Sequence, residues 1–240
     1  MKRILISRTD SIGDVALTLP MCQALRSKYP EAEIIFIGKN YTRPLVKCFK
    51  AIDDFWDIDE LFNLPISSQL EKLQADCIIH VFPNKKLAFL AKKARISLRI
   101  GTSHRVFHLF TCNMRPNFTR KNSSLHESQL NFHLLAPLGI TEIPSFQQIQ
   151  ELVQFQITPT ELPPWIPTSK EERIILHPKS KGSALEWPLE KYMGLALQLA
   201  ESGKTVCFTG TEQEGTQFRH LLPVHDRIID TTGKLSLDQL

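Results

Sequence analysis

Asp14 is the acidic side chain that lies where this chain is best placed to do chemistry, at the end of a short polar loop. The loop follows Ile4-Leu5-Ile6, a continuous apolar run that favours a strand buried on both faces of a parallel sheet. Ligands of open α/β sheets bind outside the carboxyl ends of the strands. The segment from Arg8 to Asp14 therefore lies where the topology predicts a ligand, and the Asp14 carboxylate is the first candidate functional group.

A purely structural role explains the same residues. Ser11-Ile12-Gly13-Asp14 fits a serine-x-x-acid capping box, and acidic residues in a first helical turn also complement the helix dipole. The residues themselves leave both roles open. The loop lacks G-x-G-x-x-G, so a dinucleotide cofactor is not expected in this half, and a nucleotide-dependent oxidoreductase is disfavoured.

A second group of candidate residues lies in the C-terminal half. The segment HPKSKGS, residues 177–183, follows the apolar run 174–176 and offers hydroxyls, backbone amides and two lysines. This chemistry holds a diphosphate near a helix start, although the segment is not a Walker loop and ordinary turn composition also explains it. Thr209-Gly210-Thr211-Glu212 follows the next predicted strand and has the same two interpretations, a ligand-binding segment or a plain turn.

Positive charge is concentrated in one segment. The net charge of the chain is only +4, but residues 85–122 contain no acidic residue. Such a block attracts anionic partners, which favours a phosphorylated, acidic-sugar lipid acceptor or an anionic membrane surface, with nucleic acid second. The alternative is a solvated helix over Lys85–Ala94 that buries its apolar residues, Phe89 included. The cations of the block are Lys85, Lys86, Lys92, Lys93, Arg95, Arg99, Arg105, Arg115, Arg120 and Lys121.

Composition is that of a soluble globular protein, with 42% hydrophobic and 22% charged residues among 240. No segment approaches the roughly 18 apolar residues of a membrane-spanning helix, and a cytoplasmic location is expected. The five cysteines lack C-x-x-C spacing and lie mostly in apolar segments, which predicts reduced core thiols. His104 and His108 have i, i+4 spacing, but a metal site is not expected there.

The elements that would position these residues alternate between strand and helix. This alternation predicts an α/β fold with a doubly wound, mainly parallel sheet. Residues 101–124 have no clear period and are predicted to be a long functional or disordered connection. After a first strand–helix–strand unit over residues 4–37, helices are predicted near 44–49, 69–74, 85–94 and 125–138, and strands near 55–58, 77–82 and 98–100.

A proline-rich stretch over residues 158–167 divides the chain, because its prolines exclude a regular helix or a central strand. Beyond it, a fresh strand at 174–176, a helix at 189–200 and a strand at 206–208 begin a second unit of the same kind. The predicted domains are an N-terminal Rossmann-like domain of residues 1–157, a linker of residues 158–170 and a partial second domain of residues 171–240.

Four motifs follow one another along the chain. Residues 8–14 read R-x-D-S-I-G-D and precede V-A-L-T-L-P and a helix that ends in Y-P. Arg99-Ile100-Gly101 follows the basic helix, and then come His126 and NFHLLAPLGI, residues 131–140. The third motif is HPKSKGSALEWPLEKYMGLALQLAESGKTVCFTGTEQE, residues 177–214, and the fourth is TGKLSL, residues 232–237. In this order, over nearly the whole length, they resemble glycosyltransferase family 9, the bacterial ADP-heptose:lipopolysaccharide heptosyltransferases.

The resemblance implies a GT-B fold of two Rossmann-like domains, with the acceptor held mainly by the first and the nucleotide sugar by the second. It implies inverting transfer of a heptose from ADP-heptose to a lipopolysaccharide inner-core acceptor, with Asp14 as the general base. It implies no cofactor besides the nucleotide-sugar donor, no metal, and a place at the cytoplasmic face of the inner membrane. Nucleic acid is not an expected partner.

The resemblance also assigns site residues. On the acceptor side it assigns Ser11, Gly13, Arg105 and His126. For the donor it assigns Lys179, Ser180, Lys181, Gly182, Thr209, Gly210 and Glu212. The chain departs from the family before Trp187-Pro188, where basic residues are common but Leu185-Glu186 stands, so Glu186 would repel a diphosphate if it points inward.

Family members continue past the T-G-K-x-S-L segment, so roughly a quarter to a third of the expected protein lies outside these 240 residues. We therefore expect an incomplete second domain. The alternative function is that of a truncated, non-catalytic remnant or a split-enzyme subunit that keeps acceptor or partner binding.

Overall fold

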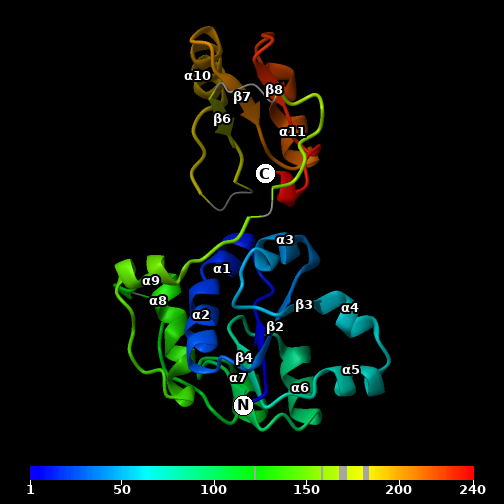
Figure 1. The fold of residues 1–240 in the computed structure, drawn as a ribbon, viewed down its shortest axis with the longest axis vertical. Helices are drawn as coiled ribbons and strands as arrows, with labels where there is room; N and C mark the ends of the chain where they lie inside the picture. Colours follow the sequence, from blue (N-terminus) through cyan, green and yellow to red (C-terminus); the bar gives the residue numbers. More distant parts are fainter. Residues whose placement is uncertain (122, 158, 168–171, 181–183) are drawn as a thin grey trace. The chain divides into compact units, whose positions relative to one another are not determined.

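The chain forms two compact units, unit 1 (Met1–Thr158) and unit 2 (Pro159–Leu240), shown in Figure 1. The computed structural model describes residues 1–121, 123–157, 159–167, 172–180 and 184–240. Each unit has its own parallel sheet and its own hydrophobic core. The predicted α/β class with parallel sheets is therefore confirmed, and the boundary between the units falls at the start of the proline-rich stretch.

The sheet of unit 1 has five parallel strands in the order β3-β2-β1-β4-β5. The chain builds outward from β1 through β2 to β3, and then returns to the other side of β1 for β4 and β5. The direction of building therefore reverses between β1 and β4, and such a switch point leaves a crevice at the carboxyl ends of the two strands. The strands are β1 (Arg3–Ser7), β2 (Glu33–Gly38), β3 (Asp54–Asp57), β4 (Cys77–His80) and β5 (Leu98–Ile100).

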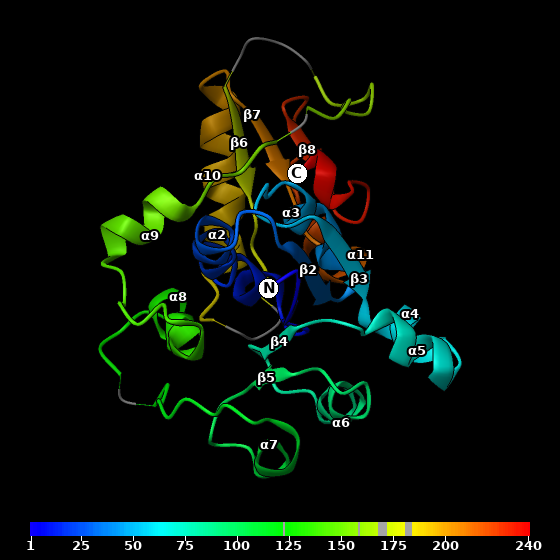
Figure 2. The same cartoon turned by 60° about the horizontal axis from the view of Figure 1, so that its bottom comes forward.

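Helices cover both faces of this sheet, as Figures 1 and 2 show. Successive side chains of β1 point to opposite faces, so Ile4 and Ile6 join one core while Leu5 joins the other. All three are fully buried, which explains why their run is continuously apolar. The helices of unit 1 are α1 (Ile12–Ala16), α2 (Leu19–Lys28), α3 (Arg43–Lys47), α4 (Ile58–Asn63), α5 (Ile66–Lys72), α6 (Lys85–Lys93), α7 (Val106–Thr111), α8 (Glu127–Leu130) and α9 (Phe146–Leu152), with 3-10 turns at Asn40–Thr42 and Asn131–Leu138.

The structure corrects several predicted elements of unit 1. Residues 101–124, predicted without regular structure, contain α7. The helix predicted over 125–138 is a short α8 followed by a 3-10 run that contains Pro137, and Gly139 ends it in the left-handed conformation at φ 72°. Phe89, which the solvated-helix alternative would bury, is 46% exposed, because α6 buries the stripe made by Leu87, Ala88, Leu90 and Ala91 instead.

Unit 2 has a three-stranded parallel sheet in the order β6-β7-β8. Its core contains Leu176, Val206 and Phe208 from the strands and Ala196 and Phe218 from the helices. The strands are β6 (Arg173–Leu176), β7 (Thr205–Phe208) and β8 (Ile228–Asp230); the helices are α10 (Leu189–Glu201) and α11 (Glu212–Phe218), with 3-10 turns at Arg219–Leu221 and Leu237–Gln239.

The cysteines carry free thiols, as their spacing predicted, and all of them except Cys48 are buried. Burial raises the pKa of Cys77 to about 12 and also raises that of Cys112, so these thiols are poor nucleophiles at neutral pH. Among the described residues, no helix is both long enough and apolar enough to cross a membrane.

Candidate functional site

A pocket of about 610 Å³ opens at the carboxyl ends of the unit 1 strands. Arg8, Asp10 and Asp14 line it from the segment after β1, Val81 lines it from just after β4, and Thr102 lines it from just after β5. The pocket therefore lies at the switch point between β1 and β4, where the strand order of the sheet predicts a ligand.

Arg8 organises the acidic side of this pocket. Its side chain is only 4% exposed, and its backbone N–H continues the strand by donating to the Ile37 carbonyl at 3.0 Å. Its guanidinium donates from Nε to Asp10 Oδ1 at 2.7 Å, from Nη2 to Asp14 Oδ1 at 2.7 Å and from Nη1 to Glu127 Oε1 at 3.1 Å. One buried cation thus fixes three carboxylates from two distant segments.

Asp14 has a capped backbone and a carboxylate that lines the pocket. Ser11 is the N-cap of α1, and its Oγ accepts from the Asp14 N–H at 3.4 Å. The Ser11 hydroxyl also donates to Asp14 Oδ2 at 2.6 Å, while Asp14 Oδ1 accepts from Arg8. The Asp14 side chain is 36% exposed, and each carboxylate oxygen has a second lone pair for another proton or donor. The capping interpretation and the functional interpretation of this segment are therefore compatible.

Asp10 shares the same guanidinium in a drier environment, with its side chain 19% exposed. Burial raises the pKa of Asp10, and this effect outweighs the opposing influence of Arg8. Tyr41 closes over the loop by donating its hydroxyl to the Asp10 carbonyl at 2.8 Å. Burial, assisted by Asp10 and Asp14, raises the pKa of Tyr41, so this phenol stays neutral.

The other predicted acceptor-side residues take different positions. Arg105 is exposed and lines the pocket from the start of α7. His126 caps α8 instead: its Nδ1 lies 2.8 Å from Ser128 Oγ, and its ring packs edge-on against Phe146. Gly13 is exposed outside the pocket lining, and a Cβ there would meet only Ser11 Oγ at 3.9 Å. Of these three, only Arg105 lines this pocket.

Three further cations line the same pocket. Arg120 is held by Glu127, with Nε donating to Oε2 at 2.9 Å. Arg105 and Lys121 also line the pocket, and no acidic side chain in the described part of the chain forms an ion pair with either. These two cations remain available to an anionic ligand.

A buried histidine pair lies beside the pocket. His80 ends β4, and its Nδ1 is 3.4 Å from Ser7 Oγ. The His108 Nδ1 lies 2.9 Å from the Thr102 carbonyl, and the two rings are 5.7 Å apart. Burial lowers the pKa of His80 to about 3, so the ring is neutral at physiological pH. No three His, Cys, Asp or Glu side chains within the described ranges could hold a metal ion.

The predicted phosphate-binding segment of unit 2 is bound by a nearby carboxylate of the same unit, that of Glu186. Lys179 forms an ion pair with Glu186, and the Ser180 N–H donates to Glu186 Oε1 at 2.9 Å. The hydrogen bonds from Lys179 and Ser180 lower the pKa of Glu186, which therefore stays ionised. Glu186 thus binds the Lys179 ammonium and the Ser180 N–H, the same groups that are predicted to bind a diphosphate. Lys181 and Gly182 lie outside the described residues.

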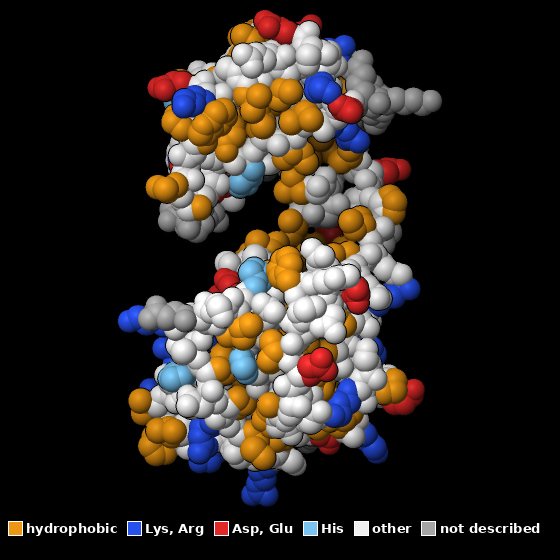
Figure 3. Space-filling model, turned by 90° about the vertical axis from the view of Figure 1, so that its left-hand side faces the viewer, with side chains coloured by type: hydrophobic (Ala, Val, Ile, Leu, Met, Phe, Trp, Pro, Cys, Tyr) orange, Lys and Arg blue, Asp and Glu red, His pale blue; other side chains and the backbone are white. Residues whose placement is uncertain are grey.

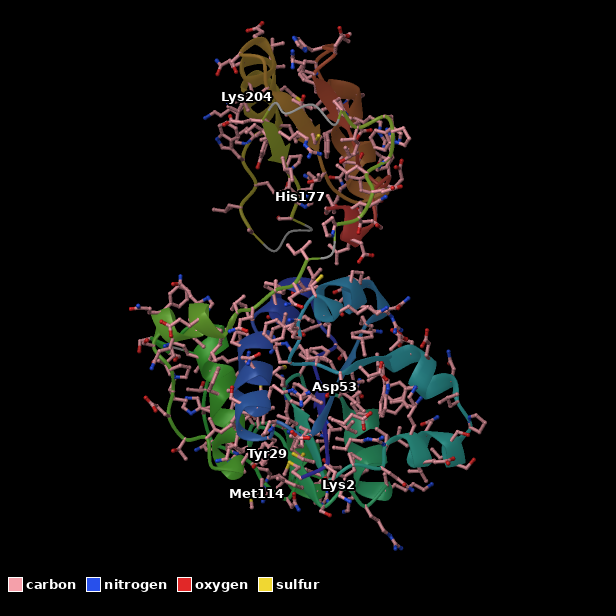
Figure 4. All side chains as sticks on the ribbon, viewed as in Figure 1. Lys2, Tyr29, Asp53, Met114, His177 and Lys204 are labelled. Atoms are coloured by element: carbon pink, nitrogen blue, oxygen red, sulfur yellow. The ribbon has the colours of Figure 1, made fainter. Side chains whose placement is uncertain are left out.

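The remaining donor-side residues follow β7. Thr209 is buried, and its Oγ1 lies 3.0 Å from Nδ1 of His177, which follows β6 (Figure 4). This contact joins the carboxyl ends of the two strands. Gly210 accepts a backbone bond from Gly233 at 2.9 Å. The carboxylate of Glu212 is bound by both Nη atoms of Arg219 at 2.8 Å, which lowers the pKa of Glu212.

The sequence analysis did not identify Arg8, Asp10 and Glu127 as individual site residues. Arg8 and Asp10 stand in R-x-D-S-I-G-D, so their proximity to Asp14 was available as a signal. Glu127 is 119 positions from Arg8 and is isolated in the sequence, so only the folded chain brings it to the site.

A family model, glycosyltransferase family 9 (heptosyltransferase), matches residues 65–240. A family 9 glycosyltransferase from Veillonella parvula DSM 2008 has a TM-score of 0.75 at 19% identity, covering 99% of this chain and 71% of its own. The E. coli ADP-heptose LPS heptosyltransferase II has a TM-score of 0.70 at 18% sequence identity, and the match covers 100% of this chain and 75% of that enzyme. E. coli heptosyltransferase WaaC with ADP has a TM-score of 0.73 at 18% sequence identity, and the match covers 98% of this chain and 76% of that enzyme. No curated protein sequence matches the chain.

Proposed function

Because this chain belongs to glycosyltransferase family 9, we propose that it transfers a heptose from ADP-heptose to a lipopolysaccharide inner-core acceptor with Asp14 as the general base. Membership makes the chain a heptosyltransferase-like glycosyltransferase. The observation that carries the proposal is the Asp14 carboxylate, which lines the switch-point pocket and is held there by Arg8 and Ser11.

In the proposed reaction an acceptor hydroxyl in the pocket loses its proton to Asp14 as its oxygen attacks the anomeric carbon of the heptose. The bond from that carbon to the diphosphate oxygen breaks on the opposite face, and ADP leaves with the electron pair. The anomeric carbon is thereby inverted. Arg8 and Ser11 fix the orientation of the carboxylate, so little reorganisation is needed when the proton moves.

The acceptor side of the proposal rests on charge. Arg105 and Lys121 line the same pocket as the acidic cluster and suit the phosphate or acid-sugar groups of a lipopolysaccharide precursor. Such an acceptor is anchored in lipid, so the proposal places the protein in the cytoplasm at the face of the inner membrane.

The donor side of the proposal uses Lys179, Ser180 and Thr209, which follow neighbouring parallel strands of unit 2. ADP and an ADP-heptose analogue are bound by the E. coli enzyme WaaC in its solved structures. Glu186 would have to release Lys179 and the Ser180 N–H before a diphosphate could bind them. That requirement favours a second candidate, a non-catalytic chain that keeps acceptor or partner binding.

Two matched variants test the assignment of the base. Asp14→Asn keeps an oxygen for Arg8 and should reduce kcat by about 10²–10⁴-fold with little change in melting temperature. Asp10→Asn alters the other carboxylate on the same guanidinium and should retain most of the activity. Full activity of Asp14→Asn would contradict the base assignment. A folded wild-type protein that binds neither ADP nor ADP-heptose in a calorimetric titration would favour the second candidate.

A further inference from the structure

A surface of mixed cationic and apolar character lies beside β5, the edge strand of the unit 1 sheet. We name it the α6–α7 surface and define it by Phe89, Lys92, Lys93, Arg95, Leu109 and Phe110. Helices α6 and α7 lie side by side in Figures 1 and 2, and Lys92 Nζ joins them by donating to the Phe110 carbonyl at 2.7 Å. The two helices therefore present one continuous surface.

The charge of this surface has a single sign. Residues 77–126, which contain both helices, include no aspartate or glutamate. Lys93 and Arg95 are exposed, and neither forms an ion pair with any residue that the structure describes. Figure 3 shows Lys and Arg side chains projecting from the lower end of unit 1, with hydrophobic side chains among them. An anionic partner would therefore meet no carboxylate from either helix.

The apolar side chains on the surface are large and solvent-exposed. Leu109 and Phe110 are 53% and 64% exposed on α7, and the neighbouring Val106 is 74% exposed. Phe89 on α6 is 46% exposed and lines an open hollow of about 700 Å³ together with Lys93 and Arg95. Contiguous exposed apolar side chains mark an interaction site on a globular protein.

Arg95 adds an independent observation. Its φ is 58°, and among the described residues it is the one non-glycine residue with a positive φ. It follows the C-cap of α6, where glycine fits best, and Ile96 N–H closes the turn on the Ala91 carbonyl at 3.2 Å. A cation therefore stands at a position where the backbone favours glycine.

We propose that the α6–α7 surface docks unit 1 onto an anionic phospholipid membrane. Basic side chains around exposed Leu, Val and Phe suit the lipid interface, where cations meet headgroups and apolar side chains enter the acyl boundary. Nucleic acid would pair with the cations, but it would offer no apolar contact for the aliphatic side chains of Leu109 and Val106. The inference rests on the proposed function only for its lipid-linked acceptor, because vesicle binding needs neither substrate nor transfer.

Vesicle flotation tests the proposal with the full chain. Wild-type protein should bind phosphatidylethanolamine vesicles that contain about 30% phosphatidylglycerol and bind phosphatidylcholine vesicles at least about tenfold less. Lys93→Gln/Arg95→Gly should weaken binding by about 25-fold at most, since each cation near the surface contributes about fivefold. Its fold should persist, because glycine accepts the φ of Arg95. Phe110→Ser should weaken the binding that survives about 0.5 M salt.

The matched control removes two cations elsewhere in unit 1. Lys47 and Lys50 are exposed at the end of α3, which lies away from α6 and α7 in both ribbon views. Lys47→Gln/Lys50→Gln should bind vesicles within about twofold of wild type. Equal losses in the two double variants, no binding by wild type, or binding of duplex DNA without vesicle binding would each overturn the proposal.

The test separates this proposal from the proposed function. Asp14→Asn should bind vesicles like wild type even though transfer fails. If vesicles are not bound but a delipidated acceptor is still glycosylated in an Asp14-dependent manner, the docking surface is wrong and the enzymatic proposal stands.

Discussion

Replacing Arg8 with methionine tests whether this guanidinium holds the pocket together. Methionine roughly matches the stem of arginine but removes the charge and all five donors. The variant leaves Asp10, Asp14 and Glu127 without the cation that they share, and the Arg8 side chain is only 4% exposed. We expect a folded but clearly destabilised protein at pH 7.

The magnitude follows from burial. Breaking a buried ion pair by removing one partner costs about 3–5 kcal/mol. The three carboxylates are 19%, 36% and 20% exposed, and Glu127 keeps its bond to Arg120 at 2.9 Å. Partial solvation and the remaining partner place the loss near the lower end of that range, at about 3 kcal/mol. A loss of this size corresponds to a fall in melting temperature of about 6–12 °C for a chain of this length.

The destabilisation should shrink in acid. Burial already raises the pKa of Asp10, and removal of Arg8 takes away the two largest influences that oppose this rise, its charge and its hydrogen bond. A carboxyl whose folded pKa lies above its unfolded value favours folding when protonated, and this contribution is lost as pH rises. The difference in unfolding free energy between wild type and Arg8→Met should therefore be largest at pH 7 and should decrease toward about pH 4.

The free energy of unfolding is measured by urea titration of a variant that keeps a single tryptophan as the fluorescent probe. Trp165→Phe/Trp187→Phe removes both tryptophans of unit 2 and leaves Trp56, which is 9% exposed in β3 of unit 1. Lys39→Gln is the surface control, because Lys39 and Asp59 are 39% and 61% exposed and their ion pair should contribute at most about 1 kcal/mol. A loss below about 1 kcal/mol for Arg8→Met, or one that does not shrink in acid, would refute the reasoning.

Two further predictions follow from the remaining contacts. Glu186→Gln should strengthen ADP binding in calorimetric titrations by about threefold or more at low salt and less at high salt, because it frees Lys179 from a competing anion; Glu172→Gln should not change it. Weaker ADP binding by Glu186→Gln would count against a phosphate site at Lys179. The buried His80 is neutral when folded, with a pKa of about 3, and takes a proton when unfolded, so wild-type stability should fall by up to about 2 kcal/mol from pH 6.5 to 5. His80→Asn should flatten that slope in urea titrations, and an unchanged slope would show that other groups cause it.

Long buried runs were predictable and short helices were not. Ile4 to Ile6 and Ile34 to Ile37 are apolar on both faces because helices cover both sides of the sheet, and this pattern is visible in the residues themselves. α4 and α7 have six residues each and α9 has seven, too few turns for a 3.6-residue period to be recognised. Their position depends on packing against the sheet rather than on local pattern.

The sequence by itself determined the local part of the candidate site. Arg8, Ser11 and Asp14 lie within one strand-to-helix turn, so their contacts need only that turn to form. Tertiary structure alone decided which partners complete the site, because burial and ion pairing depend on segments that are distant in sequence. It brought Glu127 to Arg8 across 119 positions, and it left Phe89 exposed on a helix whose other apolar residues are buried.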